Sequence, residues 1–179
     1  MDVATGFDGQ EDRLIALFTA TFTDTEGAEE GRLIGGLVHD LLTTTPASDI
    51  HVFRAEDDST LIGAAIFTQI TYPDEPNRVV LLSPMAVATD RQGKGVGQAL
   101  LIQALATLRS EGAEVALTYG DPDYYKRVGF APITEQQACA PLPLSHPQGW
   151  IGQSLTDQPM PILSGRPTCV PALNRADVW

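Results

Sequence analysis

The chain has few cysteines, few lysines and arginines, and no long apolar run. Its 179 residues include only two cysteines, Cys139 and Cys169, whose spacing is not that of a metal site, and we expect both to be free thiols without a chemical role. Lysine and arginine total 11 against 23 aspartate and glutamate residues. The resulting net charge of −12 argues against nucleic-acid binding, which needs clustered cations. No apolar run approaches the roughly 20 residues of a membrane span, so no membrane partner is expected.

The composition is that of an ordinary globular protein. Hydrophobic residues make up 43% of the chain and charged residues 19%, which allows a sizeable core. We expect a single domain over residues 1–179, with the informative motifs in residues 78–131 and a proline-rich extension in residues 132–179. The first residues are acidic and do not form a basic start followed by an apolar segment, so a cytoplasmic location is expected instead of secretion.

Apolar periodicity predicts two helices and a hairpin in the N-terminal part. Leucine and phenylalanine recur at helical spacing over residues 14–22, and a second helical pattern covers residues 34–41. Each of three glycines near the second pattern lowers helix stability by about 1 kcal/mol relative to alanine, so tertiary contacts must support that helix. Strands are predicted over residues 50–56 and 60–70, joined by the turn Asp57-Asp58-Ser59.

A nearly continuous apolar run over residues 78–88 predicts a central strand that is covered on both faces. Pro84 interrupts this run. Because proline has no amide to donate, it predicts a β-bulge or a place where the neighbouring strand has moved away. In that case the backbone groups of residues 85–87 are open to a ligand. The alternative is that Pro84 faces a loop or marks a shorter strand.

Three glycines between this strand and the next helix predict a phosphate site. The helical pattern runs from Val96 to Arg109. The first amides of a helix have no internal partner, the helix dipole is positive there, and glycines let an anion approach the backbone. The segment Gln92-Gly93-Lys94-Gly95-Val96-Gly97 fits neither the nucleotide P-loop nor the dinucleotide-binding pattern, because each requires a residue that is absent here.

The same segment has the form QxxGxG, and in this the sequence resembles the GNAT superfamily of acetyl-CoA-dependent N-acetyltransferases. A second similar motif, Tyr-xxx-Gly-Phe, begins at Tyr125 after a predicted strand over residues 115–119. The residues before it have the form GDPxYY, which resembles a poorly characterised bacterial-type branch of predicted acetyltransferases. The resemblance is clear over residues 81–130.

The resemblance implies a fold and a co-substrate. The fold is α/β, with a mixed, mostly antiparallel twisted sheet that is split by a β-bulge and has helices on both faces. The co-substrate is acetyl-CoA, whose pyrophosphate is bound by loop amides and whose pantetheine arm pairs with the end of the central strand. No metal is implied. The implied cofactor-binding residues are Met85, Ala86, Val87, Gln92, Gly93, Lys94, Gly95, Val96, Gly97 and Gln98.

The implied reaction is the direct attack of a neutral primary amine on the thioester in a ternary complex. The acceptor is a small-molecule amine or an amine of a peptide or protein. The Val87 amide is the expected donor to the thioester carbonyl oxygen, and the Tyr125 hydroxyl matches the group that gives the departing sulfur a proton. The alternative for Tyr125 is a ring that packs and bonds locally, which is the expected role of Tyr124.

Charged residues near these motifs have two interpretations. Each is a candidate ligand of the outer CoA phosphates or an ordinary surface charge, and the set consists of Arg91, Lys94, Lys126 and Arg127. The acceptor amine must lose a proton, but the sequence does not name the base. The carboxylates that border the acceptor side in the family, each also expected as surface charge, are Glu26, Glu29, Glu30, Asp74 and Glu75.

The C-terminal extension contains 8 of the 13 prolines, which predicts short strands and ordered loops, with the best strand candidate at residues 149–155. We expect this extension to close the acceptor side of the sheet or to form a homodimer contact. Two other functions stay open. One is a regulatory module that binds acetyl-CoA without catalysis, and the other is an acyltransferase for a longer acyl-CoA.

Overall fold

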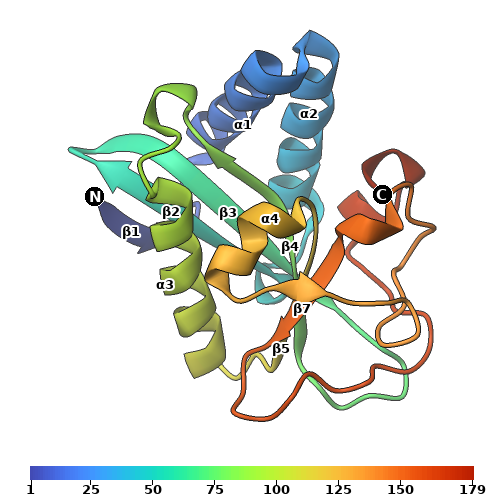
Figure 1. The fold of residues 1–179 in the computed structure, drawn as a ribbon. Helices are drawn as coiled ribbons and strands as arrows, with labels where there is room; N and C mark the ends of the chain where they lie inside the picture. Colours follow the sequence, from blue (N-terminus) through green and yellow to red (C-terminus); the bar gives the residue numbers. More distant parts are fainter. The chain divides into compact units, whose positions relative to one another are not determined.

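The computed structural model describes residues 1–179 (Figure 1). Its seven strands form a sheet in the order β1-β2-β3-β4-β5-β7-β6. β4 and β5 are parallel, whereas β1 with β2, β5 with β7 and β6 with β7 are antiparallel, which is the mixed sheet that was predicted. The helices and strands are β1 (Asp2–Thr5), α1 (Glu11–Glu26), α2 (Ala28–Thr44), β2 (Ile50–Asp57), β3 (Thr60–Ile70), β4 (Val79–Val87), α3 (Val96–Ser110), β5 (Val115–Tyr119), α4 (Pro122–Tyr125), β6 (Ala131–Pro132) and β7 (Trp150–Ser154).

The chain divides into two compact units that alternate along the sequence. The first unit consists of Met1–Phe67 and Pro84–Ala104, and the second of Thr68–Ser83 and Leu105–Trp179. β3, β4 and α3 each begin in one unit and end in the other. The single domain expected over residues 1–179 stays a prediction. No helix combines the length and the apolar character that crossing a membrane requires.

Helices lie on both faces of the strands of the first unit. A Cβ atom placed at Gly63 of β3 would lie 3.5 Å from Val96 Cγ1 of α3 and 3.6 Å from Ala55 Cβ of β2, so α3 covers that face. Glu56 follows Ala55 in β2 and therefore points to the opposite face. There a guanidinium nitrogen of Arg13 in α1 lies 4.0 Å from the Glu56 carboxylate.

α1 and α2 lie side by side because α2 has glycines where α1 touches it (Figure 1). A Cβ atom at Gly31 would overlap the hydroxyl group of Thr23, and one at Gly35 would overlap that of Thr19. These contacts are the tertiary support that the second predicted helix requires. Each glycine therefore has two opposing effects on the stability of α2. It lowers the intrinsic helix propensity, and it allows the close packing with α1 that compensates for this loss.

The N-terminal hairpin is confirmed, and one further strand joins it. Asp58 and Ser59 connect β2 and β3 with φ angles of 47° and 63°, a left-handed pair that suits the tight turn of a hairpin. β1 pairs with β2 in antiparallel register from Asp2 opposite Glu56 to Thr5 opposite Phe53. The sequence does not predict this strand, because four residues are too few to show an alternating pattern.

The backbone of β4 changes its hydrogen-bonding side along the strand. Directly before β4, the carbonyl of Arg78 accepts from the amides of Glu114 (2.9 Å) and Val115 (3.4 Å), so residue 78 faces β5. Directly after β4, the amide of Ala88 donates to the carbonyl of Ile62 (2.9 Å), so residue 88 faces β3. In a regular strand, two residues an even number apart face the same side. The change of side indicates one extra residue within β4, as in the bulge expected near Pro84.

In the second unit, β5 pairs with β4 on one side and β7 on the other. The parallel pairing with β4 runs from Val79 opposite Val115 to Leu82 opposite Thr118. The antiparallel pairing with β7 runs from Val115 opposite Ser154 to Tyr119 opposite Trp150, which confirms the strand predicted within residues 149–155.

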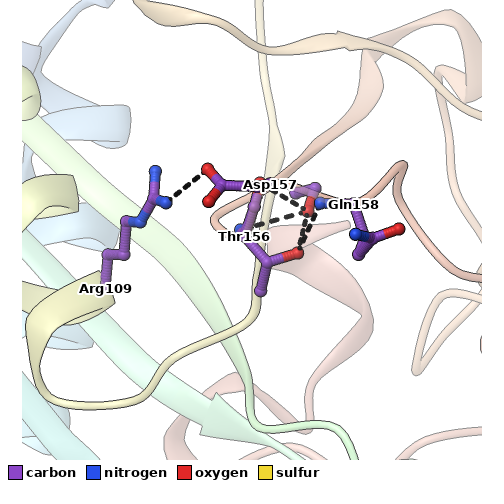
Figure 2. Close-up of polar contacts among 5 residues, drawn as sticks. Arg109, Thr156, Asp157 and Gln158 are labelled. Carbon is purple, nitrogen blue, oxygen red and sulfur yellow. Dashed lines mark hydrogen bonds and ion pairs between the residues drawn. The ribbon is translucent and has the colours of Figure 1, made fainter.

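The turn after β7 is joined to the end of α3 by an exposed ion pair (Figure 2). Arg109 contacts the Asp157 carboxylate at 2.6 Å, and the hydroxyl groups of Ser154 and Thr156 lie 3.0 Å apart within the turn. Because both charges are exposed, this pair contributes little to stability.

Both cysteines of the C-terminal extension are free, as expected. No group of side chains in the chain suits a metal ion.

Two buried threonines of the second unit differ in their hydrogen bonding, and we expect valine to have opposite effects at the two positions. Thr68 and Thr118 are 0% and 1% exposed. The Thr68 hydroxyl has no partner, whereas that of Thr118 donates to the Leu82 carbonyl at 2.9 Å. Thr68→Val should raise the free energy of unfolding and Thr118→Val should lower it, each by about 1 kcal/mol in urea denaturation. Changes of the same sign in both variants would contradict this assignment.

Candidate functional site

A run of backbone amides without partners lies between β4 and the body of α3. The amides of Arg91 and Gln92 donate to the carbonyls of Ala88 (2.8 Å) and Thr89 (3.4 Å), and the next bond along the chain is that of the Ala99 amide to the Gly95 carbonyl (3.0 Å). The six amides of residues 93–98 make no hydrogen bond within the chain. Because these amides open a helix whose dipole is positive at this end, they can bind an anion such as a phosphate group.

Glycine is required twice in this loop. Gly93 and Gly95 have φ angles of 72° and 80°, in the left-handed region that other residues adopt only with strain. A Cβ atom at either position would meet nothing within 4 Å. The requirement therefore comes from the backbone angle, and the space beside both residues is open to a ligand.

The end of β4 presents backbone groups on the side away from β3. Since the Ala88 amide faces β3, Val87 and Met85 face away from β3 according to the alternation of a strand. The carbonyl of Val87 accepts a hydrogen bond from the Gln92 side-chain nitrogen at 3.0 Å. The amide of Val87 points to the same side, and no strand of the first unit pairs with it there. The pairing of residues 85–87 with a ligand stays a prediction.

Arg91, a candidate phosphate ligand, is instead held within the first unit. Its guanidinium lies 2.8 Å from the carboxylate of Asp57 at the end of β2 and 3.5 Å from that of Asp90. The hydrogen bond from Arg91 lowers the pKa of Asp57, and the same bond raises the pKa of Arg91. Since both side chains are solvent-accessible, the pair mainly fixes the direction of the Arg91 side chain.

Two of the other three candidate cations also bond to groups of the chain. Lys94 donates to the Asp90 carbonyl at 2.9 Å, and Lys126 forms an ion pair with the Asp123 carboxylate. The hydrogen bond from Lys126 lowers the pKa of Asp123. Arg127 is exposed and makes no ion pair in the structure. The outer-phosphate role of these residues stays a prediction.

Tyr125, in the second unit, ends the short helix α4. The Asp121 side chain caps this helix by accepting from the amide of Asp123 at 2.9 Å, and Pro122 occupies its first turn. The ring of Tyr125 packs edge-on against those of Tyr124 and Phe130, at centroid distances of 5.0 and 5.7 Å. The ring therefore packs against its neighbours, which is part of the alternative role considered for Tyr125. This packing also fixes the direction of its hydroxyl group.

Burial raises the pKa of the Tyr125 hydroxyl well above its ordinary value of 10. The neighbouring Tyr124 acts in the same direction, whereas the Thr118 hydroxyl opposes it. Part of the side chain remains exposed although the hydroxyl end is surrounded by protein. Tyr125 therefore keeps its proton throughout the neutral range and can donate a hydrogen bond.

No general base can be identified among the carboxylates named from the sequence. Glu75 accepts a hydrogen bond from the Ser164 amide at 3.0 Å, which gives it a structural role. Glu26, Glu29 and Glu30 lie at the turn between α1 and α2, the last two in the first turn of α2. None of these three makes a side-chain hydrogen bond or an ion pair in the structure.

The sequence-predicted site residues fall into two groups. The ten implied cofactor-binding residues of β4 and the glycine loop all lie in the first unit, where the Gln92 side chain joins the loop to Val87, whereas the candidate phosphate ligands Lys126 and Arg127 lie in the second. Tyr125 lies in the second unit. Sequence reasoning missed the contact of Gln92 with Val87, for which no pattern exists. It also missed Thr118, although a threonine directly after the apolar residues 115–117 was a visible sign.

Comparison with known proteins gives consistent matches. The family model of the acetyltransferase (GNAT) domain matches residues 48–132. An uncharacterized N-acetyltransferase of Escherichia coli K12, YjhQ, is 31% identical over 167 residues, covering 85% of this chain and 92% of that protein.

Solved structures of the same family are similar in fold. The GNAT family N-acetyltransferase YhbS of E. coli, in complex with CoA, superposes with a TM-score of 0.82 at 22% identity, over 98% of this chain and 92% of that one. A GNAT family acetyltransferase of Brucella melitensis, in complex with acetyl-CoA, gives a TM-score of 0.73 at 22% identity, over 96% of each chain. These matches confirm the predicted fold class.

The loop glycine Gly95 and the helix glycine Gly36 should respond to alanine in opposite ways. Gly95→Ala places a Cβ in open space but at a left-handed φ, so it should lower the free energy of unfolding by about 1 kcal/mol. Gly36→Ala also meets nothing within 4 Å, but it lies within α2 at an ordinary helical φ, and should raise that free energy by up to about 1 kcal/mol. Urea denaturation measures both, and a neutral Gly95→Ala would contradict the strain argument.

Proposed function

Because the chain belongs to the GNAT family of acetyltransferases, we propose that it transfers the acetyl group of acetyl-CoA to a primary amine in a ternary complex. The observation that supports this most directly is the run of six unpartnered amides in residues 93–98, at the position where the sequence has the QxxGxG motif. A pyrophosphate supplies the acceptors that these amides lack. The left-handed Gly93 and Gly95 keep the approach to them open.

The acetyl thioester is proposed to bind at the end of β4. The amides of Val87 and Met85 point away from β3, and Val87 is the proposed donor to the thioester carbonyl oxygen. That oxygen gains negative charge as the amine attacks the carbonyl carbon. A fixed backbone donor stabilises this charge more than it stabilises the ground state, which is the requirement for catalysis. The pantetheine arm would use the same side of residues 85–87.

Tyr125 is proposed as the hydrogen-bond donor to the departing sulfur. The amine nitrogen forms a bond to the acetyl carbon, the carbon–sulfur bond breaks, and the nitrogen loses a proton. A free thiol has a pKa of about 8.5, below that of a buried tyrosine. The raised pKa of Tyr125 therefore supports hydrogen-bond donation to the developing thiolate more than complete proton transfer. The nitrogen proton leaves by a base or water that the sequence does not name.

The acceptor is proposed to be an amine of a small molecule, a peptide or a protein. The net charge of −12 favours a cationic acceptor such as a polyamine, an amino sugar or a basic peptide. Dependence on acetyl-CoA supports a cytoplasmic location, where this metabolite is available.

The release of CoA thiol from acetyl-CoA tests the function, measured with the purified protein across amines, amino acids, peptides and aminoglycosides. Turnover with one class would establish the transferase and its acceptor class. Binding of acetyl-CoA without turnover on any acceptor would favour the regulatory module, and turnover only with a longer acyl-CoA would favour that alternative acyltransferase. Failure to bind any acyl-CoA would contradict the proposal.

Replacing Tyr125 by phenylalanine should separate turnover from binding. Tyr125→Phe removes only the hydroxyl, so kcat should fall about 10- to 1000-fold while the Kd for acetyl-CoA, measured by calorimetry, stays nearly unchanged. Since burial raises the Tyr125 pKa, kcat of the wild-type enzyme should not decline through ionisation of this residue below about pH 10. Tyr124→Phe is the matched control and should retain most of the activity. Unchanged turnover in Tyr125→Phe would remove Tyr125 from the mechanism.

A further inference from the structure

The Gln92 side chain makes a contact that its place in the glycine motif does not require. Only the backbone of a loop residue is needed to bind a phosphate. The side-chain nitrogen of Gln92 nevertheless turns back over the 3-10 turn Thr89–Arg91 and donates to the carbonyl of Val87 at 3.0 Å. Because a carbonyl can only accept, the amide group must present its nitrogen here.

This contact fixes one peptide group at both ends. The carbonyl of Val87 and the amide of Ala88 belong to the same peptide plane. The amide donates to Ile62 of β3 at 2.9 Å, and the carbonyl accepts from Gln92. Rotation of this plane would break both bonds. Gln92 thus provides, on the side of β4 away from β3, a donor that a paired strand would otherwise supply.

The surrounding turn is held at two further points of the first unit. The Thr89 hydroxyl donates to the Asp24 carboxylate of α1 at 2.7 Å, and Arg91 pairs with Asp57 of β2 at 2.8 Å. These bonds hold the turn against α1 and β2. Of these side-chain bonds, only that of Gln92 reaches a residue of β4, and it comes from the residue directly before the run of unpartnered amides.

The geometry points to Gln92 as a positioning residue for acetyl transfer: its side chain holds the Val87–Ala88 peptide and so sets the end of β4 relative to the amides of residues 93–98. This inference rests on the proposed function. A single ligand molecule that binds both to the end of β4 and to the amides of residues 93–98 requires a fixed separation between the two. A misplacement of the reacting group by about 1 Å costs on the order of 100-fold in rate. The effect should therefore appear in the chemical step more than in co-substrate binding.

Two substitutions separate this role from a direct phosphate contact. Gln92→Met keeps the length of the side chain and the loop amide but removes the donor, and Gln92→Lys restores a donor. Gln153→Met is the matched control, because the Gln153 side chain makes the same kind of bond, to the Val128 carbonyl at 3.0 Å in the second unit. Each variant is compared with the wild type in kcat, in the Kd for acetyl-CoA, and in hydrogen exchange of the Ala88 amide.

We expect Gln92→Met to lower kcat about 30-fold while the Kd for acetyl-CoA changes less than about 3-fold. Gln92→Lys should recover kcat to within about 3-fold of the wild type, and Gln153→Met should keep it. A Kd weakened with kcat unchanged would show a phosphate contact and overturn the inference, as would equal kcat losses in Gln92→Met and Gln153→Met.

Hydrogen exchange separates this inference from the proposed function. If the wild type transfers no acetyl group, the proposed function fails while the peptide contact can still be judged. Faster exchange of the Ala88 amide in Gln92→Met, but not in Gln92→Lys, would support the contact. Unchanged exchange in Gln92→Met would overturn it.

Discussion

The backbone donors of residues 93–98, which have no acceptor within the chain, are the feature on which the account of the site depends. Helices always leave their first amides without partners, but this chain leaves the preceding loop amides unpartnered as well. Left-handed glycines at Gly93 and Gly95 make that loop possible. The nearby cations are mostly bonded to carboxylates or carbonyls of the chain, so the binding capacity of the loop lies chiefly in its backbone.

The same principle explains the end of β4. A strand that keeps neighbours on both sides has no free donors, and a strand that loses one neighbour exposes every second residue on that side. At Arg78 the backbone groups face β5, whereas at Ala88 they face β3. Pro84, which has no N–H group to donate, lies between these two residues. The amide of Val87 is then turned away from β3 while Gln92 holds its carbonyl. The loop thus has donors without partners, and the neighbouring strand end has donors that point away from β3.

Much of this arrangement could be predicted because it is local. The strand over residues 78–88, the helix from Val96 and the glycines between them follow from periodicity and backbone chemistry, and the fold class followed from two short motifs. Contacts between distant residues could not be predicted. The close packing of α1 against Gly31 and Gly35, the pair of Arg91 with Asp57, and the bond of Thr118 to Leu82 depend on the tertiary structure. For that reason the sequence leaves each cation with two interpretations, a phosphate ligand or a surface charge.

Amide chemical shifts of residues 93–98 during titration with acetyl-CoA measure whether these amides bind the pyrophosphate. The matched ligand is S-acetyl-pantetheine, which has the thioester but lacks the pyrophosphate. These six amide protons should shift downfield with acetyl-CoA, because they gain charged acceptors, and should not shift in this way with S-acetyl-pantetheine. Binding of acetyl-CoA that leaves these six amides unchanged would contradict the assignment of the loop.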